Sequence, residues 1–130
     1  NNSHKFESNF VDVDIEKNES VMFGSLSGSK LGLWVAHGEG HFSLPEPESA
    51  YNIVMKYSYD KYPANPNGSD YNTAGIASAD GRHVAMMPHP ERAFLPWQSA
   101  FYPSSRKNDE ITPWVEAFVN ARKWVEEHTK

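Results

Sequence analysis

The sequence lacks cysteine altogether. Without a thiol, the chain itself cannot supply a disulfide, a thiolate zinc site or a cysteine nucleophile. It also lacks any apolar run near the roughly 18–20 residues that a membrane-spanning helix requires, and its polar first residues show no signal-peptide pattern. The lack of cysteine is compatible with a reducing cytosol without proving one, and we expect no membrane partner.

Positive charge is scarce as well. The sequence has 12 Lys and Arg against 17 Asp and Glu, which gives a formal net charge of −5. A negative chain gains nothing from bulk electrostatic attraction to phosphate, so we expect no nucleic acid as a partner. Hydrophobic residues make up 38% of the chain and charged residues 22%, a balance typical of a folded domain, and the 130 residues suffice for one.

Strand patterns dominate the chain. Alternating or continuous apolar residues predict strands at residues 10–15, 31–36, 51–59, 73–78 and 83–87. The second of these runs is almost entirely apolar, which predicts a strand buried on both faces. An Asp-Gly pair at residues 80–81 predicts a hairpin turn between the last two strands. Residues 62–69 are dense in turn formers, and their Asn and Ser side chains are expected to stabilise a loop.

One helix is expected, near the C-terminal end. Thr112 can cap it, and Pro113 suits the first helical position, where no N–H is needed. Steps of three and four residues then predict a stripe that packs inward. Its members are Trp114, Val115, Phe118, Ala121, Arg122 and Val125. A single helix after several strands, in a chain that opens with Asn rather than Met, predicts that part of a domain is missing.

The sharpest local motif places His89 and Glu91 on either side of Pro90, just past the last predicted strand. In an extended chain residues i and i+2 point to the same face, and Pro90 favours extended geometry at His89, so the two side chains should lie side by side. A carboxylate beside an imidazole can hold its tautomer and stabilise the imidazolium, as in a catalytic triad. Taken by itself, however, the spacing favours a surface turn whose two side chains face solvent.

A second motif, HGEGH at residues 37–41, follows directly on the apolar run. Its two glycines indicate a tight turn or a backbone that a ligand approaches closely. If the strand continued, His37, Glu39 and His41 would share one face with a spacing that can bind a divalent metal. Taken by itself, the motif favours a glycine-rich hairpin over ligand contact, and ligand contact over a metal site.

Five stretches carry a family resemblance. Residues 84–92 (VAMMPHPER) resemble the His-x-Glu strand of class I, triad-type, glutamine amidotransferases, and residues 33–40 (LWVAHGEG) resemble the strand and turn upstream of it. Three further stretches resemble the amidotransferase of purine biosynthesis in particular: residues 5–8 (KFES), 62–69 (YPANPNGS) and 120–123 (NARK). The motifs keep the family's order, so the resemblance covers essentially the whole chain.

The resemblance implies an α/β fold, in which residues 1–130 form the C-terminal half of a flavodoxin-like glutaminase domain, rich in strands and ending in a helix. It implies a cytosolic enzyme that releases ammonia from glutamine. The ammonia then serves a synthase domain that uses ATP and Mg²⁺. No metal or other cofactor is expected in this chain itself.

Residue by residue, the resemblance makes His89 the general base and Glu91 its orienting acid, and it places His37, Gly38 and Glu39 in the glutamine pocket. The family's reaction also needs a cysteine thiolate and main-chain N–H groups that stabilise an oxyanion, both from a region upstream of these motifs. This sequence departs from the family there, because it has no cysteine. We therefore expect the chain alone to be inactive, with the nucleophile-bearing half absent.

The loss of half a domain should expose strand edges, and exposed edges recruit partners. We expect contact with the missing half and the synthase domain, or self-association through strands at residues 31–36 and 84–87. Two alternatives stay open. One is a fragment of another class I amidotransferase, against which residues 62–69 argue; the other is a non-enzymatic α/β module that binds a metal through HGEGH.

Overall fold

The computed structural model describes residues 1–129. The strands are β1 (Glu7–Ile15), β2 (Lys30–His37), β3 (Asn52–Tyr57), β4 (Thr73–Ala77) and β5 (Val84–Met86), and the helix is α1 (Trp114–His128). Short 3₁₀ turns lie at Gly24–Leu26, Glu48–Ala50, Asp70–Asn72, Pro90–Arg92, Pro96–Gln98 and Ser104–Arg106. A strand-rich α/β chain with a C-terminal helix is thus confirmed, and each strand predicted from the sequence is present.

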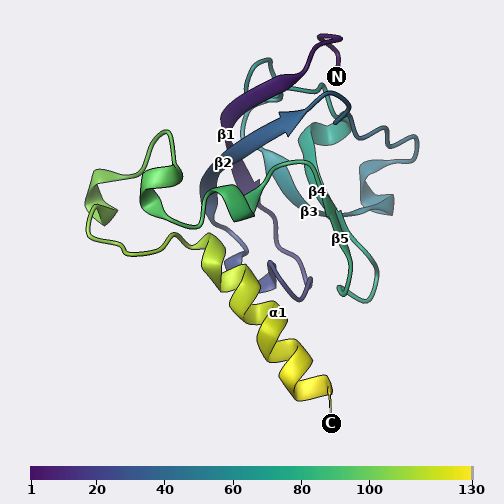
Figure 1. The fold of residues 1–130 in the computed structure, drawn as a ribbon. Helices are drawn as coiled ribbons and strands as arrows, with labels where there is room; N and C mark the ends of the chain where they lie inside the picture. Colours follow the sequence, from purple (N-terminus) through teal and green to yellow (C-terminus); the bar gives the residue numbers. More distant parts are fainter. Residues whose placement is uncertain (130) are drawn as a thin grey trace.

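The strands form a curled sheet with the order β2-β1-β3-β4-β5, and each pairing is antiparallel. The longest pairing joins β1 to β2, with Glu7 opposite His37 at one end and Asp14 opposite Lys30 at the other. Beyond β5 the chain crosses to β2, where His89 forms an isolated antiparallel bridge with Trp34 (Figure 1). The two edges of the sheet are therefore joined by the segment that carries the His-Pro-Glu motif.

Alternation along the strands builds the core. On β1, Val11, Val13 and Ile15 are buried while the residues between them are more exposed, as the period of two requires. On β2, Leu33 and Val35 are fully buried. The expectation that β2 is buried on both faces is wrong, because its opposite face is only half covered: Trp34 packs edge-to-face on Phe10, with ring centroids 5.1 Å apart, and stays partly exposed.

The start of the helix also differs from the expectation. Pro113, not Thr112, is the N-cap residue, and no side chain caps the helix. The Thr112 hydroxyl instead donates to the carbonyl oxygen of Ala93, at 2.6 Å. Because Thr112 is buried, its hydroxyl needs a partner in the core, and this requirement takes precedence over the cap.

The predicted inward stripe of α1 is correct in part: the face that packs inward carries Trp114, Ala117, Ala121 and Trp124, of which only Trp114 and Ala121 belong to the predicted stripe. Trp114 and Ala117 are buried, but Phe118 is 42% and Val125 is 52% exposed. The reason is geometric, since α1 runs away from the sheet after its first turns (Figure 1). Phe118, Val119 and Val125 are thus left partly exposed along the helix.

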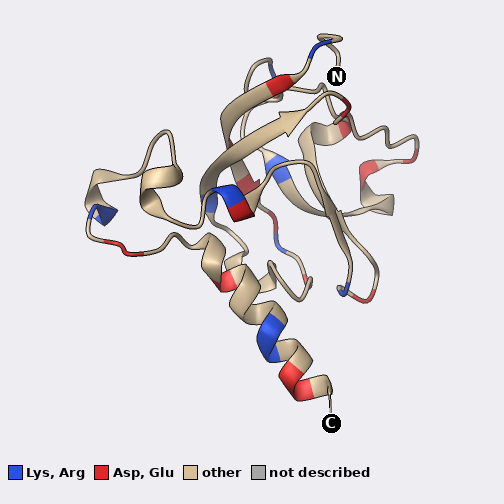
Figure 2. Ribbon diagram, in the orientation of Figure 1, with Lys and Arg blue, Asp and Glu red and all other residues tan. Residues whose placement is uncertain are grey.

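Charges of both signs are mixed along the surface, as on α1, where acidic and basic residues alternate (Figure 2). Within residues 1–129, no helix is both long and apolar enough to cross a membrane.

Candidate active site

The His-Pro-Glu motif is anchored to the sheet through its first residue. The backbone of His89 is extended, with φ −113° and ψ 90°, and its amide donates to the carbonyl oxygen of Trp34 at 2.8 Å. Pro90 then opens a 3₁₀ turn (Pro90–Arg92), because its fixed φ suits a first helical position that needs no N–H. The extended geometry expected at His89 is confirmed, but it ends there, and Glu91 lies on a turn instead of an extended chain.

The side chains of His89 and Glu91 nevertheless meet. Nδ1 of His89 lies 2.6 Å from Oε1 of Glu91. Their predicted proximity is confirmed, and the turn brings it about where an extended chain was expected. The contact leaves Nε2 of His89 without a hydrogen-bond partner within the described residues, on a side chain that is 30% exposed. The pair can thus hold the imidazole by one nitrogen and offer the other to an incoming group.

His37 ends β2 and lies close enough to His89 to interact with it electrostatically. Both of its ring nitrogens are buried and have no partner among residues 1–129. Burial is the main cause that lowers its pKa below the usual 6.5, and repulsion by a protonated His89 acts in the same direction. His37 is therefore a neutral imidazole at pH 7.

The ring of His37 is covered by Gly40. A Cβ atom placed on Gly40 would lie 2.6 Å from two ring atoms of His37, well inside van der Waals contact. Gly38 and Glu39, between them, are exposed and form a bend. The turn thus sets two exposed residues beside a buried imidazole.

The metal alternative fails on this geometry. β2 stops at His37 and the chain bends at once, so His37, Glu39 and His41 do not share a strand face. Nδ1 of His41 lies 3.0 Å from the carbonyl oxygen of Asn67, and its Nε2 lies 3.7 Å from Asp70. Over the described part of the chain, no three His, Asp or Glu side chains are grouped to hold a metal ion.

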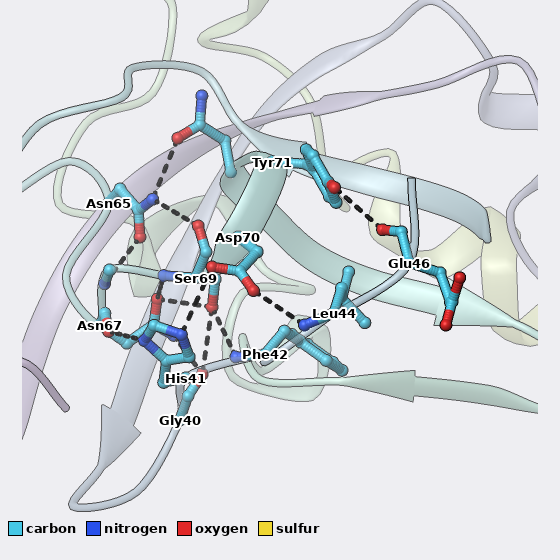
Figure 3. Close-up of polar contacts among 12 residues, drawn as sticks. Gly40, His41, Phe42, Leu44, Glu46, Asn65, Asn67, Ser69, Asp70 and Tyr71 are labelled. Carbon is cyan, nitrogen blue, oxygen red and sulfur yellow. Dashed lines mark hydrogen bonds and ion pairs between the residues drawn. The ribbon is translucent and has the colours of Figure 1, made fainter. Parts of the chain in front are cut away.

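The turn-rich stretch at residues 62–69 does more than the sequence indicated. Its side chains stabilise their own loop, as expected, but they also hold the chain that follows β2 (Figure 3). Asn67 donates to the carbonyl oxygen of Gly40, and the amide of Phe42 donates to Oγ of Ser69 at 2.9 Å. These contacts span 27 residues of sequence, so local turn propensity could not reveal them.

A family model described as a CobB/CobQ-like glutamine amidotransferase domain matches residues 1–125. The chain therefore belongs to this glutamine amidotransferase family.

Its relatives point to one kind of amidotransferase. The chain is 41% identical, over 97% of its length, to "Probable phosphoribosylformylglycinamidine synthase, chloroplastic/mitochondrial" of Arabidopsis thaliana and 38% identical, over 96%, to phosphoribosylformylglycinamidine synthase of Homo sapiens. It spans only 10% of the length of each. Among solved structures, it resembles PurLQS from Thermotoga maritima, with a TM-score of 0.72 and 27% identity over 96% of this chain and 50% of that one.

Proposed function

We propose that this chain is the base-bearing part of the glutaminase of a phosphoribosylformylglycinamidine synthase. In that enzyme, ammonia from glutamine serves the ATP-dependent conversion of formylglycinamide ribonucleotide to formylglycinamidine ribonucleotide in purine biosynthesis. The observation that carries the proposal is the 2.6 Å contact between Nδ1 of His89 and Glu91. The relatives of this chain, each named for this synthase, support the choice of reaction.

His89 serves as the proton carrier of this reaction and Glu91 as its orienting acid. A cysteine thiolate attacks the side-chain amide carbon of glutamine, and the protonated imidazole gives its Nε2 proton to the departing nitrogen, which leaves as ammonia. In the second half, Nε2 takes a proton from the water that cleaves the thioester and releases glutamate. Glu91 holds Nδ1 throughout and stabilises the imidazolium that is present before the first step and forms again in the second.

The turn after β2 forms one wall of the glutamine pocket. Gly38 and Glu39 are exposed, so a ligand can reach the main chain of both and the carboxylate of Glu39. The ring of His37, whose two nitrogens are buried, lies behind them. A neutral His37 beside a cationic His89 adds no second positive charge to the site. These three residues bind glutamine in the proposal, and they take no part in proton transfer.

The nucleophile comes from outside this sequence, since the chain contains no cysteine. We call the assembly of this chain with the segment that carries the cysteine the complete glutaminase. The uncovered apolar side chains of α1, with Trp97 78% and Phe101 72% exposed, are surfaces on which that segment or the synthase domain can pack. Alone, the chain is inactive, and it self-associates if these surfaces and its strand edges meet a second copy.

ATP and Mg²⁺ belong to the synthase domain in this proposal, and this chain binds neither. The reaction is placed in the cytosol. Fractionation of the source cells tests the placement: recovery with organelles, where the name of the Arabidopsis relative places that protein, would contradict it.

Glutamate release from glutamine tests the function directly. The chain alone is expected to release none, and the complete glutaminase is expected to release glutamate and ammonia in equal amounts. His89→Ala in the complete glutaminase should abolish release while ammonia-driven synthesis in the whole synthase continues. Release that persists undiminished in His89→Ala would show that another residue carries the proton.

A further inference from the structure

We infer that Asn67 is a positioning residue for glutamine binding, which acts by fixing the main chain of residues 37–42. This role rests on the proposed function, because it assumes that the turn after β2 lines the glutamine pocket. Asn67 lies on a different loop and is fully buried, with 0% of its surface exposed. Its side chain reaches the turn through Gly40, whose carbonyl oxygen accepts a hydrogen bond from Nδ2 (Figure 3).

The amide group of Asn67 has only one orientation that satisfies its neighbours. Nδ2 donates to Gly40 and, at 3.2 Å, to the hydroxyl of Tyr57. Oδ1 accepts from the amide of Ser69 at 3.1 Å and from its hydroxyl at 2.9 Å. Burial raises the pKa of Tyr57 to about 12, so this hydroxyl stays neutral throughout the working range. A flipped amide would set its oxygen against the Gly40 carbonyl in a buried site.

The turn has no regular structure of its own, so side chains must satisfy its peptide groups. On one side, Asn1 donates through Nδ2 to the carbonyl of His37 at 2.7 Å and accepts at Oδ1 from the amide of Gly40 at 3.1 Å. On the other side, Asn67 binds the Gly40 carbonyl. The amide and the carbonyl group of Gly40 are thus each hydrogen-bonded to an asparagine side chain.

Gly40 transmits this restraint to the proposed binding residues. It lies close against the ring of His37, so a shift of its main chain changes the space that the imidazole occupies. His89 does not depend on this turn, because the carbonyl of Trp34 and the carboxylate of Glu91 hold it. Loss of the Asn67 contact should therefore weaken glutamine binding more than it slows proton transfer.

The chain provides a matched control in Asn65, on the same loop and 5% exposed. The Asn65 side chain bonds within its own region: Nδ2 donates to Ser69 and Asn72, and Oδ1 accepts from Gly68. It makes no hydrogen bond to residues 37–42. Both side chains lose a buried donor on replacement by aspartate, but only Asn67 touches the turn.

The test compares Asn67→Asp with Asn65→Asp in the complete glutaminase. In Asn67→Asp a carboxylate oxygen faces the Gly40 carbonyl, and the hydrogen bond between them is lost. One lost buried hydrogen bond corresponds to about a tenfold change in an equilibrium constant. We therefore expect KM for glutamine to rise by about tenfold while kcat stays within about threefold. Asn65→Asp should leave KM within about twofold. Equal rises in KM for the two variants, or a fall in kcat alone, would overturn the inference.

A milder variant keeps the inference testable if Asn67→Asp does not fold. Ser69→Ala removes the acceptor of the Phe42 amide, one bond to Asn67 and a longer bond, at 3.4 Å, to the carbonyl of Gly40. Hydrogen exchange at Phe42 should accelerate by about tenfold, while the amide of Leu44, bound at 2.8 Å to Asp70, serves as the internal reference. Unchanged exchange at Phe42 together with unchanged KM would overturn the positioning role.

Hydrogen exchange is measured without glutamine turnover, so different results would contradict the proposed function and the positioning role of Asn67. Wild-type complete glutaminase that releases no glutamate would overturn the proposed function, and the role of Asn67 in binding with it, whatever the exchange result. An active enzyme whose KM for glutamine is unchanged by Asn67→Asp would overturn this inference alone.

Discussion

The main-chain amide of His89 donates to the carbonyl oxygen of Trp34 across 2.8 Å. This bond joins the segment beyond β5 to β2, at the opposite edge of the sheet. Because β2 ends at His37, the same bond brings the His-Pro-Glu motif beside the glycine-rich turn. The proposed base is therefore fixed by the sheet, and the proposed binding wall by a loop.

The first prediction concerns Glu91. In Glu91→Gln the side chain keeps its shape but loses the charge that stabilises the imidazolium, and its amide can hold the wrong tautomer of His89. We expect kcat for glutamine hydrolysis in the complete glutaminase to fall by at least about 100-fold with KM little changed, as for orienting acids of triads.

The matched control is Glu127→Gln, an exposed glutamate near the end of α1. It should leave glutaminase kinetics unaltered. Steady-state glutamate release measures kcat and KM for both variants. A Glu91→Gln enzyme with normal kcat would show that Glu91 is not the orienting acid.

Local patterns in the sequence were enough to predict the strands and the meeting of His89 with Glu91. Alternation along β1 reports which face is buried, and the apolar run of β2 predicts a strand although not how far its second face is covered, because each pattern depends on side chains within a few residues of one another. The side chains of His89 and Glu91 meet across one intervening proline, which is a local event even though the backbone forms a 3₁₀ turn there. The family resemblance then supplied the expected roles.

What the sequence could not reveal depends on distant contacts. The Thr112 hydroxyl bonds Ala93 instead of capping α1, and Asn67 reaches Gly40 from another loop. Likewise, the stripe of α1 is apolar as predicted, yet the helix turns away from the sheet and leaves Phe118 exposed. Periodicity reports which face is apolar, and only the three-dimensional fold decides what covers it.

The second prediction concerns the contact between Gly40 and His37. In Gly40→Ala the new methyl group would lie 2.6 Å from the imidazole, so the ring or the turn must move. We expect a loss of about 1–3 kcal/mol in the free energy of unfolding, the usual cost of overpacking.

Gly38→Ala is the control for this substitution. Its methyl group would find only Phe6, at 3.9 Å, and Gly38 is exposed. Its free energy of unfolding should change by less than about 0.5 kcal/mol. Denaturant unfolding of the complete glutaminase compares the two, and equal effects would contradict the contact.

The third prediction is a dependence of stability on pH. Burial lowers the pKa of His37 in the folded protein below the 6.5 of an unfolded chain, so at mildly acidic pH the unfolded state binds the extra proton. The contribution of His37 is therefore fully present above pH 6.5 and is lost as the pH falls from there through the folded pKa.

His37→Asn should flatten the dependence of the free energy of unfolding on pH in this window, because the variant has no group that titrates there. His83→Gln, at a side chain that is 81% exposed, is the control and should keep the wild-type slope. Urea unfolding at a series of pH values gives both slopes. A His37→Asn protein with the wild-type slope would show that another group is responsible.

The fourth prediction concerns the junction of α1 with the sheet. Trp114 is 1% exposed, packs edge-to-face on Phe23 and donates from Nε1 to the carbonyl of Gly32 on β2 at 2.9 Å. Trp114→Phe removes this bond from the partly buried carbonyl of Gly32 and opens a cavity, so we expect a loss of about 2–4 kcal/mol. Trp97→Phe is the matched control, since Trp97 is 78% exposed and its replacement should cost less than about 0.5 kcal/mol. Thermal unfolding of the complete glutaminase measures the loss of stability in both variants. A larger loss for Trp97→Phe than for Trp114→Phe would mean that the ring of Trp97 is buried against the added segment. This interface would then contribute more stability than the junction of α1 with β2.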